Sequence, residues 1–541
     1  MFSATAGPLK YAIFRWLWIA SLASNIGSFM HGVGSAWLLT SLTASATIIA
    51  LLPVANALPA VLLALPSGAL ADVMDRRRLL LISQSIMLTA AAVLGVLAWR
   101  DLVTPAVLLA ATAMLACGSV LNSPAFASLA PDIVPRDELP QALVLNGLAF
   151  TGAMVVGPAL GGAVVAASGP AAVFMINAVS FLGQMIVISR WRPAPRETKL
   201  PPEHVLGAVR AGLRYLRHAR PLQIVLARVG AAAIAFGALF ALLPLVARRQ
   251  LELDAGGFGL LFGAMGIGAV AGAFIIPRVR ERTSLDVVVA GSSIAMAFAM
   301  LVLALADSLR PALAGLVVGG VGQMGLMSSM NLAAQRVLPA WVRGRGLAVY
   351  QLTFQLAVAI GALLWGFVAT ASSPSTALMI SAALLVATIG LTPWLRLGPL
   401  LEMDAVTGRW PTPHIALVPD PEDGPVLVTS EYEVLPEDVR AFAVAMAALG
   451  VVRRRDGALR WTCWADLTTP GRYFETYVVA SWAEHLRQRE RSTPADRDRW
   501  LAVRKFHRGE GEDGVIVRWH LPLRPGHEPP SALPSTDDLL P

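Results

Sequence analysis

A cluster of charged residues interrupts a long apolar stretch near the start of the chain. Residues 67–80 are SGALADVMDRRRLL, so Asp72 and Asp75 precede Arg76, Arg77 and Arg78. Gly68 has no side chain, so a neighbouring helix can approach the chain closely just before Asp72. A carboxylate there can accept hydrogen bonds from the positive N-terminal end of that helix. We therefore interpret Asp72 as a candidate latch between two helices, with a solvated loop carboxylate as the alternative.

The three arginines of this stretch have a simpler interpretation. Basic loops mark the cytoplasmic side of membrane proteins. Arginines in this position could also bind lipid phosphate or pair with acidic residues. We expect at least two of the three to serve mainly as topology markers.

One titratable side chain, His31 in GSFMHGVGSAW, lies well inside an apolar stretch. Histidine titrates near neutral pH, and an ionisable residue inside a membrane span indicates function by default. His31 is therefore the candidate proton carrier. The alternative is a histidine hydrogen-bonded near one membrane surface.

Uncharged polar side chains within the apolar stretches could line a cavity or join helices. The candidates are Asn25, Asn122, Asn146, Gln323, Gln351 and Gln355, together with Thr151, Asn177, Gln184, Asn331 and Thr353. A cavity lined by amides and apolar groups suits a neutral or weakly polar organic molecule better than an ion.

The composition indicates that a membrane must position these residues. The chain has 541 residues, of which 56% are hydrophobic and 14% charged, against about 25% charged in an average soluble domain. Residues 1–400 hold 26 Lys/Arg and 13 Asp/Glu, whereas residues 401–541 hold 17 and 22. A basic, apolar body thus precedes an acidic, polar C-terminal region. Nucleic-acid binding is disfavoured, because the basic residues lie in loops between apolar stretches.

Other sequence features exclude further classes. The two cysteines, Cys117 and Cys463, lie far apart, which argues against a disulfide framework. We identify no cleavable signal peptide, no metal-spacing motif, no catalytic residues and no cofactor. No G-x-x-x-x-G-K-[ST] occurs, which disfavours an ATP-driven pump.

Twelve apolar stretches have about the 20 residues that a bilayer requires. They lie near 14–38, 45–70, 79–99, 103–127, 141–166, 171–190, 224–246, 257–277, 285–306, 311–332, 347–370 and 376–396. Counting Lys and Arg in the loops gives 22 on one side and 4 on the other, namely Arg100, Arg248, Arg249 and Arg310. This bias predicts that both termini are cytoplasmic.

Landmarks recur at an offset of 204 residues. Gly68 matches Gly272, Pro135 matches Pro339, and Gly157 and Gly162 match Gly361 and Gly366. This offset takes each span to the span six places later. Because six is an even number, the chain starts each copy on the same side of the membrane, and both copies run in the same direction. The sequence predicts an all-α membrane body, with halves at 1–190 and 224–398. The connecting residues 191–223 contain an amphipathic helix suited to the cytoplasmic leaflet, with a solvated linker helix as the alternative.

The C-terminal region predicts a small α+β domain. Residues 399–425 are proline-rich and predict a linker, and residues 523–541 predict disorder. Between them, 426–522 give the order βαββαβ, a ferredoxin-like arrangement similar to the dimeric α/β-barrel fold of antibiotic-biosynthesis monooxygenases. Dimerisation through this domain is a corresponding expectation. Trp461, Trp464, His485 and His507 could line a pocket, but we favour an aromatic core and a regulatory or ligand-sensing role.

Twelve spans in two parallel halves, with G-x-x-x-D and a basic run between spans 2 and 3, resemble the major facilitator superfamily. The motif matches at Gly68, Leu70, Asp72, Arg76 and Arg77. It departs at Asp75, where the family usually has glycine. In this superfamily the partner of the loop aspartate is span 11, so the resemblance implies a latch that forms only when the cytoplasmic side is closed.

A second motif resembles that of drug exporters in this superfamily, which are typically antiporters. TGAMVVGPALGG, residues 151–162, contains Gly152, Gly157, Pro158, Gly161 and Gly162. Simple helix packing is a compatible interpretation. Longer stretches such as LNSPAFASLAPDIVPRDELPQALVLNGLAF are similar to a bacterial subgroup of secretion-type facilitators that includes the enterobactin exporter.

The resemblance implies a proton-coupled exporter of a small organic molecule, such as a drug, siderophore or secondary metabolite, in the bacterial inner membrane. Its expected partners are the substrate, protons and membrane lipids. Two alternatives remain open: an importer, or an enzyme or sensor domain tethered to a transporter-like body.

Overall fold

The computed structural model describes most of the chain. The described residues are 7–127, 129–135, 137–191, 217, 219–338, 342–397, 417–490, 494–509, 515–522 and 531–532. The chain divides into two compact units. The first, here called the helical body, comprises Met1–Pro202, Ile224–Leu332 and Ala348–Gly398, and the second contains the C-terminal domain, Pro399–Pro541, with Glu203–Gln223 and Ala333–Leu347.

Long helices account for nearly all of the described part of the body. They are α2 (Ala12–Leu42), α3 (Ala46–Val73), α4 (Arg76–Trp99), α5 (Pro105–Ala127), α7 (Leu139–Arg190), α9 (Arg220–Leu245), α10 (Ala255–Arg282), α11 (Leu285–Leu305), α12 (Leu309–Val337), α13 (Arg343–Ala371) and α14 (Pro374–Ala387). Short helical segments are η1 (Gly7–Lys10), α6 (Leu129–Ile133), the π-helical turn η2 (Val246–Gln250) and η3 (Thr388–Leu391). Ten helices among the described residues are long and apolar enough to cross a membrane.

The helix α7 contains two of the predicted spans. It has 52 residues, and Gly169 interrupts it with a φ of 78° and a ψ of 170°. A left-handed φ is accessible to glycine because it has no Cβ atom. Gly169 and Pro170 therefore form the predicted turn between residues 141–166 and 171–190. The helix α2, with 31 residues, is not among the ten because its sequence is less apolar.

Polar residues in the loops explain where several helices begin. Ser45, Asp75, Asp254, Ser284 and Ser373 each accept a hydrogen bond from a backbone N–H in the first turn of the following helix. These side chains satisfy donors that a helix N-terminus leaves free. A serine or aspartate therefore marks the end of each of these connections and the start of the next helix.

The surface of the body carries large apolar side chains. Leu62, Val179, Phe274 and Phe367 are each more than 60% exposed. Water would disfavour such a surface, whereas lipid chains would not. Together with the length of the helices, this exposure indicates an integral membrane protein.

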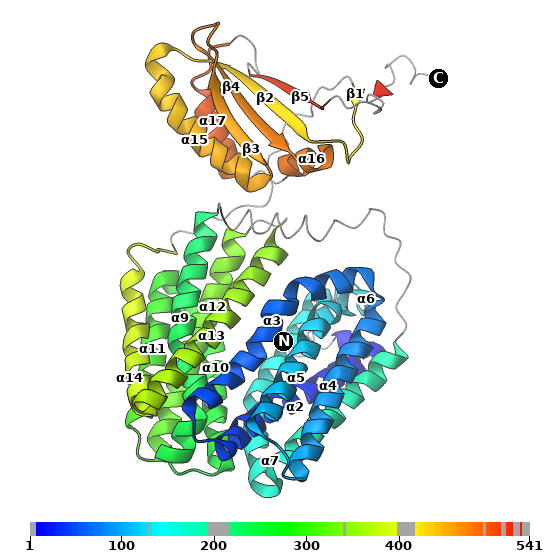
Figure 1. Ribbon diagram of the computed structural model, residues 1–541, viewed down its shortest axis with the longest axis vertical. Coiled ribbons are helices and arrows are strands. Elements are labelled where there is room, and N and C mark those ends of the chain that lie inside the picture. Colours follow the sequence, from blue (N-terminus) through cyan, green and yellow to red (C-terminus); the bar gives the residue numbers. More distant parts are fainter. Residues whose placement is uncertain are drawn as a thin grey trace. The chain divides into compact units, whose positions relative to one another are not determined.

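The helices of the body form two groups. Figure 1 shows α2 to α7 gathered into one bundle (blue to cyan) and α9 to α14 into another (green). We call these the N-terminal and C-terminal bundles. Successive crossings place the α2–α3, α9–α10 and α13–α14 connections at the same end of the body, here called the α2–α3 end. The α3–α4 and α10–α11 turns lie at the opposite end, the α3–α4 end.

The C-terminal domain contains a four-stranded antiparallel sheet with the order β3-β4-β2-β5. Its elements are β2 (Val426–Glu433), η4 (Pro436–Asp438), α15 (Val439–Asp456), β3 (Arg460–Ala465), β4 (Arg472–Val479), α16 (Trp482–Glu490), α17 (Pro494–Arg504) and β5 (Ile516–His520). The helix α16 was not predicted from the sequence. A separate pair, β1 (Leu417–Val418) and β6 (Ser531–Ala532), joins two segments from opposite ends of this domain.

The two faces of this sheet differ in burial. Val426, Val428 and Tyr432 on β2 and Val479 on β4 are buried in the core with the helices. The other face carries Trp464, 56% exposed, with Leu427 and Ile516 also exposed. The alternation follows from the two-residue period of a strand.

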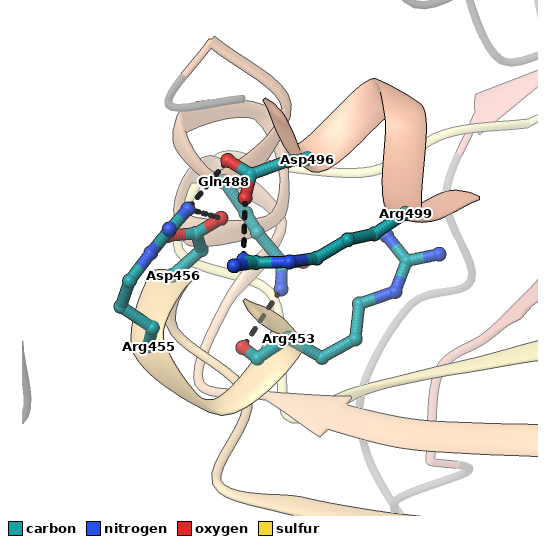
Figure 2. A network of polar contacts seen from close by, with 6 residues as sticks. All are labelled: Arg453, Arg455, Asp456, Gln488, Asp496 and Arg499. Carbon is teal, nitrogen blue, oxygen red and sulfur yellow. Dashed lines mark hydrogen bonds and ion pairs between the residues drawn. The ribbon is translucent and has the colours of Figure 1, made fainter. Parts of the chain in front are cut away.

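A buried ionic network fixes the helices of this domain to one another (Figure 2). Arg455, near the end of α15, donates to Asp456 at 2.7 and 2.9 Å and to Asp496 of α17 at 2.6 Å. Arg499 donates to the other oxygen of Asp496 at 3.4 Å. Gln488 of α16 donates to the carbonyl oxygen of Arg453 at 3.3 Å. Each buried charge therefore has a partner, as burial requires.

Parts of several predictions lie outside the described residues. These are the amphipathic helix within 191–223, most of the linker 399–425, and nearly all of 523–541. The predicted domain boundaries therefore remain predictions.

Candidate functional site

The charged turn between α3 and α4 has defined local contacts. Asp75 is the N-cap of α4, and its Oδ1 accepts from the backbone N–H of Arg78 at 2.9 Å. The aspartate that departs from the usual glycine thus begins a helix. Gly68 and Asp72 fall within the last two turns of α3, and their side chains lie outside the described part of the structure. The latch predicted for Asp72 remains a prediction.

Two arginines of this turn bind neighbouring segments of the N-terminal bundle. Arg76 Nη1 lies 2.9 Å from Asp132 Oδ2 of α6. Arg77 donates to the backbone carbonyl of Ser189, near the end of α7. These contacts join α4 to two other segments at the α3–α4 end. Arg76 and Arg77 therefore have structural partners in addition to any role in marking topology.

The C-terminal bundle has a related arrangement at Gly272 and Arg280. A methyl group on Gly272 would lie 3.2 Å from Val321 Cα of α12. About two turns later, Arg280 donates to Ser328 Oγ at 2.8 Å and Ser329 Oγ at 3.3 Å, also on α12. Gly272 and Arg280 therefore both lie against α12.

The glycine-rich segment of α7 forms the tightest helix contacts of the predicted site. A methyl group on Gly157 would lie 2.6 Å from Phe29 Cβ, and one on Gly161 would lie 2.8 Å from Met30 Cα, both on α2. A methyl group on Gly162 would lie 2.6 Å from Ala255 O and from Gly259 Cα, both on α10. The segment therefore touches α2 within its own bundle and α10 in the other.

The remaining members of this motif have different surroundings. Pro158 is buried, and its carbonyl oxygen would lie 2.9 Å from a methyl group on Gly259. Gly152 has open space where a methyl group would stand. Four of the five motif residues thus take part in close packing.

The repeat copies of these glycines make equivalent contacts. A methyl group on Gly361 would lie 2.3 Å from Ile234 O of α9, and one on Gly366 would lie 2.4 Å from Ala50 Cβ of α3. Gly157 contacts the first helix of its bundle, and Gly361 does the same in the second bundle. Gly162 and Gly366 each contact the second helix of the opposite bundle. Thr47 and Thr370 also meet there, with 3.0 Å between their hydroxyl oxygens.

His31 lies between helices of the N-terminal bundle. Its side chain is 5% exposed, and neither ring nitrogen has a hydrogen-bond partner. Its ring lies 4.6 Å from that of Phe174, on the second leg of α7. In this conformation the imidazole is buried against the Phe174 ring.

The amide side chains differ in what they contact. Asn122 Oδ1 accepts from Ser83 and Gln84, each at 3.3 Å, so it joins α5 to α4. Asn177 is buried and accepts from Ser180 within its own helix. Asn25, Asn146, Gln323 and Gln355 are half-buried and Gln351 is exposed. The structure assigns a helix-joining contact to Asn122 and leaves the cavity role of the others as a prediction.

A buried ion pair in the C-terminal bundle was not singled out from the sequence. Arg228 of α9, 5% exposed, pairs with Asp286 of α11 and also donates to Thr392 and the carbonyl of Leu395. Beside Arg228 lies a cavity of about 10 Å³, which holds no more than a water molecule. The pair joins α9 and α11, and Arg228 also holds the segment that follows η3.

The aromatic and histidine side chains of the C-terminal domain do not converge. Trp461 Nε1 donates to the fully buried Glu475 at 3.0 Å, and Trp519 Nε1 donates to His485 Nε2 at 2.8 Å. Trp464 lies on the opposite face of the sheet, and His507 Nδ1 accepts from the backbone of Glu433. Burial, followed by the nearby charge of Glu475, raises the pKa of the Cys463 thiol to about 11, so this cysteine is not an activated nucleophile.

Comparison with known proteins identifies the family. The family model described as transmembrane secretion effector matches residues 3–521. The chain belongs to this family. It is therefore a membrane transporter of the major facilitator superfamily, and not an enzyme. The resemblance inferred from the loop motif and the glycine-rich motif is confirmed.

Two individual relatives show how far the similarity of sequence extends. The multidrug efflux pump Tap of Mycolicibacterium fortuitum is 25% identical over 382 residues, which cover 69% of this chain and 91% of Tap. An uncharacterized transporter, YfiS of Bacillus subtilis, is 29% identical over 199 residues. That match covers 36% of this chain and 46% of YfiS, so it spans less than half of that relative.

Solved structures show the same fold. An inward-facing bacterial homologue of the lysosomal transporter Spinster has a TM-score of 0.57 at 15% identity, covering 72% of this chain and 96% of its own. An inward-facing bacterial homologue of ferroportin has a TM-score of 0.55 at 16% identity, covering 70% and 98%. These likenesses support the major facilitator fold of the helical body.

Proposed function

We propose that this transporter exports a small organic molecule in exchange for protons, by alternating access to the two sides of the membrane. The observation that carries the proposal is the packing of the glycine-rich segment of α7. Gly157 and Gly161 lie against α2, while Gly162 lies against α10 of the other bundle. A motif resembling that of antiporters thus occupies the contact between bundles that must change during transport.

The family comparison supports the direction and the substrate class. Tap, described as a multidrug efflux pump, aligns over 91% of its length. We infer a drug, siderophore or secondary metabolite as the substrate. The half-buried amides Asn25, Asn146, Gln323 and Gln355, with the exposed Gln351, are the side chains proposed to meet it.

The membrane topology proposed here has twelve spans in two parallel six-helix repeats. It is supported by the two legs of α7 on either side of Gly169, by the length of α2, and by the equivalent contacts of Gly157 and Gly361. The distribution of arginine and lysine supports a cytoplasmic position for both termini at a bacterial inner membrane. The α2–α3 end is then the outer end.

In this topology the structure represents an outward-closed state. Gly162 with Gly259, and Thr47 with Thr370, join the two bundles toward the outer end. We propose that Asp72 closes the opposite end in the other state by accepting hydrogen bonds from span 11. His31 remains the proposed proton carrier, which requires that its enclosed ring reach water in the outward-open state.

The C-terminal domain is proposed to be ferredoxin-like and to regulate or dimerise the transporter. The element order βαββααβ, which adds α16 to the predicted βαββαβ, and the strand order β3-β4-β2-β5 support this fold. The face carrying Leu427, Trp464 and Ile516 is the proposed dimer surface, because its apolar side chains are exposed. A ligand-sensing role is the second candidate, and the scattered positions of Trp464, His485 and His507 do not favour it.

Export is tested with everted membrane vesicles from cells that overproduce the protein. An imposed proton gradient should drive accumulation of ethidium or another compound of a drug and siderophore panel, and collapse of the gradient should abolish it. Right-side-out vesicles separate export from import, because an importer would accumulate the compound there instead. Absence of gradient-dependent accumulation across the panel would overturn the proposal.

A further inference from the structure

Two adjacent arginines stand on the side of the body where basic residues are rare. Arg248 and Arg249 are half of the four Lys/Arg expected in loops on that side. The bias of basic residues toward the cytoplasm does not explain an adjacent pair here. A specific contact with another part of the protein would explain why Arg248 and Arg249 lie there.

The arginines are carried by the π-helical turn η2, which extends α9 at the α2–α3 end. A π-helical turn is rare and often accompanies function. Two residues after its end, Glu252 has a φ of 49°, a left-handed conformation that non-glycine residues seldom adopt. Strain of this kind persists where surrounding contacts impose it.

Gln250 provides those contacts within the C-terminal bundle. Its Nε2 donates to the carbonyl oxygens of Leu303, Ala304 and Ala306 at 3.1, 3.2 and 2.9 Å. Its Oε1 accepts from Ser375 Oγ at 3.0 Å. The turn is thus fixed to the ends of α11 and α14. It holds the arginines in place relative to their own bundle.

Both arginines reach the N-terminal bundle. The Arg248 guanidinium lies 5.3 Å from the centre of the Trp37 ring, and its Nη1 donates to Thr40 Oγ1 at 3.1 Å. Arg249 Nη2 donates to the backbone carbonyl of Ala44 at 2.6 Å. These three partners, the Trp37 ring and the two acceptors, lie on the last turns of α2 or in the loop that follows.

Trp37 is held from two sides by the C-terminal bundle. Besides Arg248, it stacks on Phe258 of α10, with 5.7 Å between ring centroids and an interplanar angle of 28°. Phe258 is fully buried. A guanidinium over an indole face is the most favourable cation–π geometry among aromatic residues.

We propose that Arg248 and Arg249 form, with Trp37, Thr40 and Ala44, a latch that holds the α2–α3 end closed. These contacts cross between bundles that must separate at this end when the alternate state forms. The latch therefore exists in one state only and shifts the equilibrium toward it. It differs from the Gly162–Gly259 contact, which permits close packing but supplies no directional polar bond.

The test measures closure directly and requires no substrate. In a background with Cys117→Ser and Cys463→Ser, the pair Thr47→Cys and Thr370→Cys reports closure, because the native hydroxyls are 3.0 Å apart. Oxidation by copper phenanthroline in membranes should form the disulfide readily. Adding Arg248→Gln should lower the ratio of closed to open protein about fivefold, since loss of about 1 kcal/mol changes an equilibrium constant by that factor, and disulfide formation should slow in proportion to the closed fraction.

Matched controls separate the latch from general damage. Arg100→Gln removes an arginine on the same side that stacks on Trp99 of its own bundle, at 5.6 Å, and should leave the rate unchanged. The pair Ser85→Cys and Met185→Cys, whose native side-chain atoms are 3.5 Å apart within the N-terminal bundle, should cross-link equally with and without Arg248→Gln.

Milder variants keep the test decisive if Arg248→Gln disturbs folding. Trp37→Phe retains an apolar ring for Phe258 but weakens the cation–π contact, so it should slow closure less than Arg248→Gln. Combined with Arg248→Gln, it should add little. Equal disulfide rates at positions 47 and 370 in the parent, Trp37→Phe and Arg248→Gln proteins would overturn the latch. The measurement also separates this inference from the proposed export, since closure is read without transport.

Discussion

At the scale of single residues, the glycine-rich motif contains its own control. Replacing Gly162 by alanine would place a methyl group 2.6 Å from Gly259 Cα, a backbone atom that cannot move alone. Overpacking of this kind costs about 1–3 kcal/mol. We expect Gly162→Ala to weaken contact between the bundles and to slow disulfide formation in the Thr47→Cys and Thr370→Cys protein.

Gly152→Ala is the matched variant, because nothing lies within 4 Å of the added methyl group. Alanine also favours a helix interior by about 1 kcal/mol over glycine. It should therefore leave closure intact and raise the thermal midpoint slightly. If both variants slow closure equally, the motif acts through helix flexibility and not through close packing.

The thiol of Cys463 gives a prediction for the C-terminal domain. Its pKa is about 11, raised first by burial and then by Glu475, against an ordinary value near 9. At pH 7.5 the thiolate is therefore scarce, and a maleimide should label Cys463 slowly in a Cys117→Ser protein. Labelling should rise steeply as the pH approaches 11.

The same shift has a consequence for stability. Between pH 9 and 11 the folded thiol keeps its proton while the unfolded thiol loses it. Loss of the proton favours the unfolded state, so the free energy of unfolding declines as the pH rises through this window. A urea titration of the parent and Cys463→Ala proteins across this window measures the effect. Rapid labelling at neutral pH would contradict the burial of this thiol.

At the scale of elements, the ionic network of Figure 2 joins α15 to α17. Arg455→Ala would leave Asp456 and Asp496 buried without their main partner. Removing one member of a buried ion pair costs about 3–5 kcal/mol. We expect this variant to lower the unfolding midpoint of the C-terminal domain, monitored in the full-length protein by limited proteolysis after α14.

Arg499→Ala tests the same network from its exposed side. The Arg499 side chain is 48% exposed, and an exposed ion pair contributes about 0–1 kcal/mol. The Arg499→Ala protein should therefore resist proteolysis almost as well as the parent protein. If Arg455→Ala and Arg499→Ala were equally sensitive to protease, burial would not determine how much each ion pair stabilises the domain.

Sequence patterns predicted the elements well where local chemistry determines them. Apolar length identified the membrane helices, and Ser168, Gly169 and Pro170 identified the break in α7. The helix α16 (Trp482–Glu490) was not among the predicted elements, since TPADRDRW marks only the start of the helix that follows it. The partners of Arg248 and Arg228 were not predictable, since they lie 208 and 58 residues away in the chain, and no periodicity encodes such contacts.

At the scale of the whole molecule, the two halves are alike in packing but not in charge. Gly68 and Gly272 correspond at the offset of 204, whereas Asp72 corresponds to Ile276. If the aspartate closes the α3–α4 end, the molecule has one such latch. Asp72→Asn should then reduce transport by at least about tenfold, a loss of about 1.4 kcal/mol from the closed state.

Ile276→Asn is the matched change at the corresponding position of the second half. Ile276 is buried and packs beside Gly325, so its replacement should lower stability more than it alters the balance of states. Transport rates normalised to folded protein distinguish the two effects. Equal losses for both variants after normalisation would remove the special role of Asp72.

The central claim is proton-coupled export, and one measurement tests it most directly. Everted vesicles are energised until acridine orange is quenched, and each compound of the panel is then added. For a transported compound, proton release should partly restore fluorescence in vesicles with the parent protein and much less with Asp72→Asn. If no compound restores fluorescence beyond vesicles lacking the protein, while one still accumulates, transport is not coupled to protons and the account is contradicted.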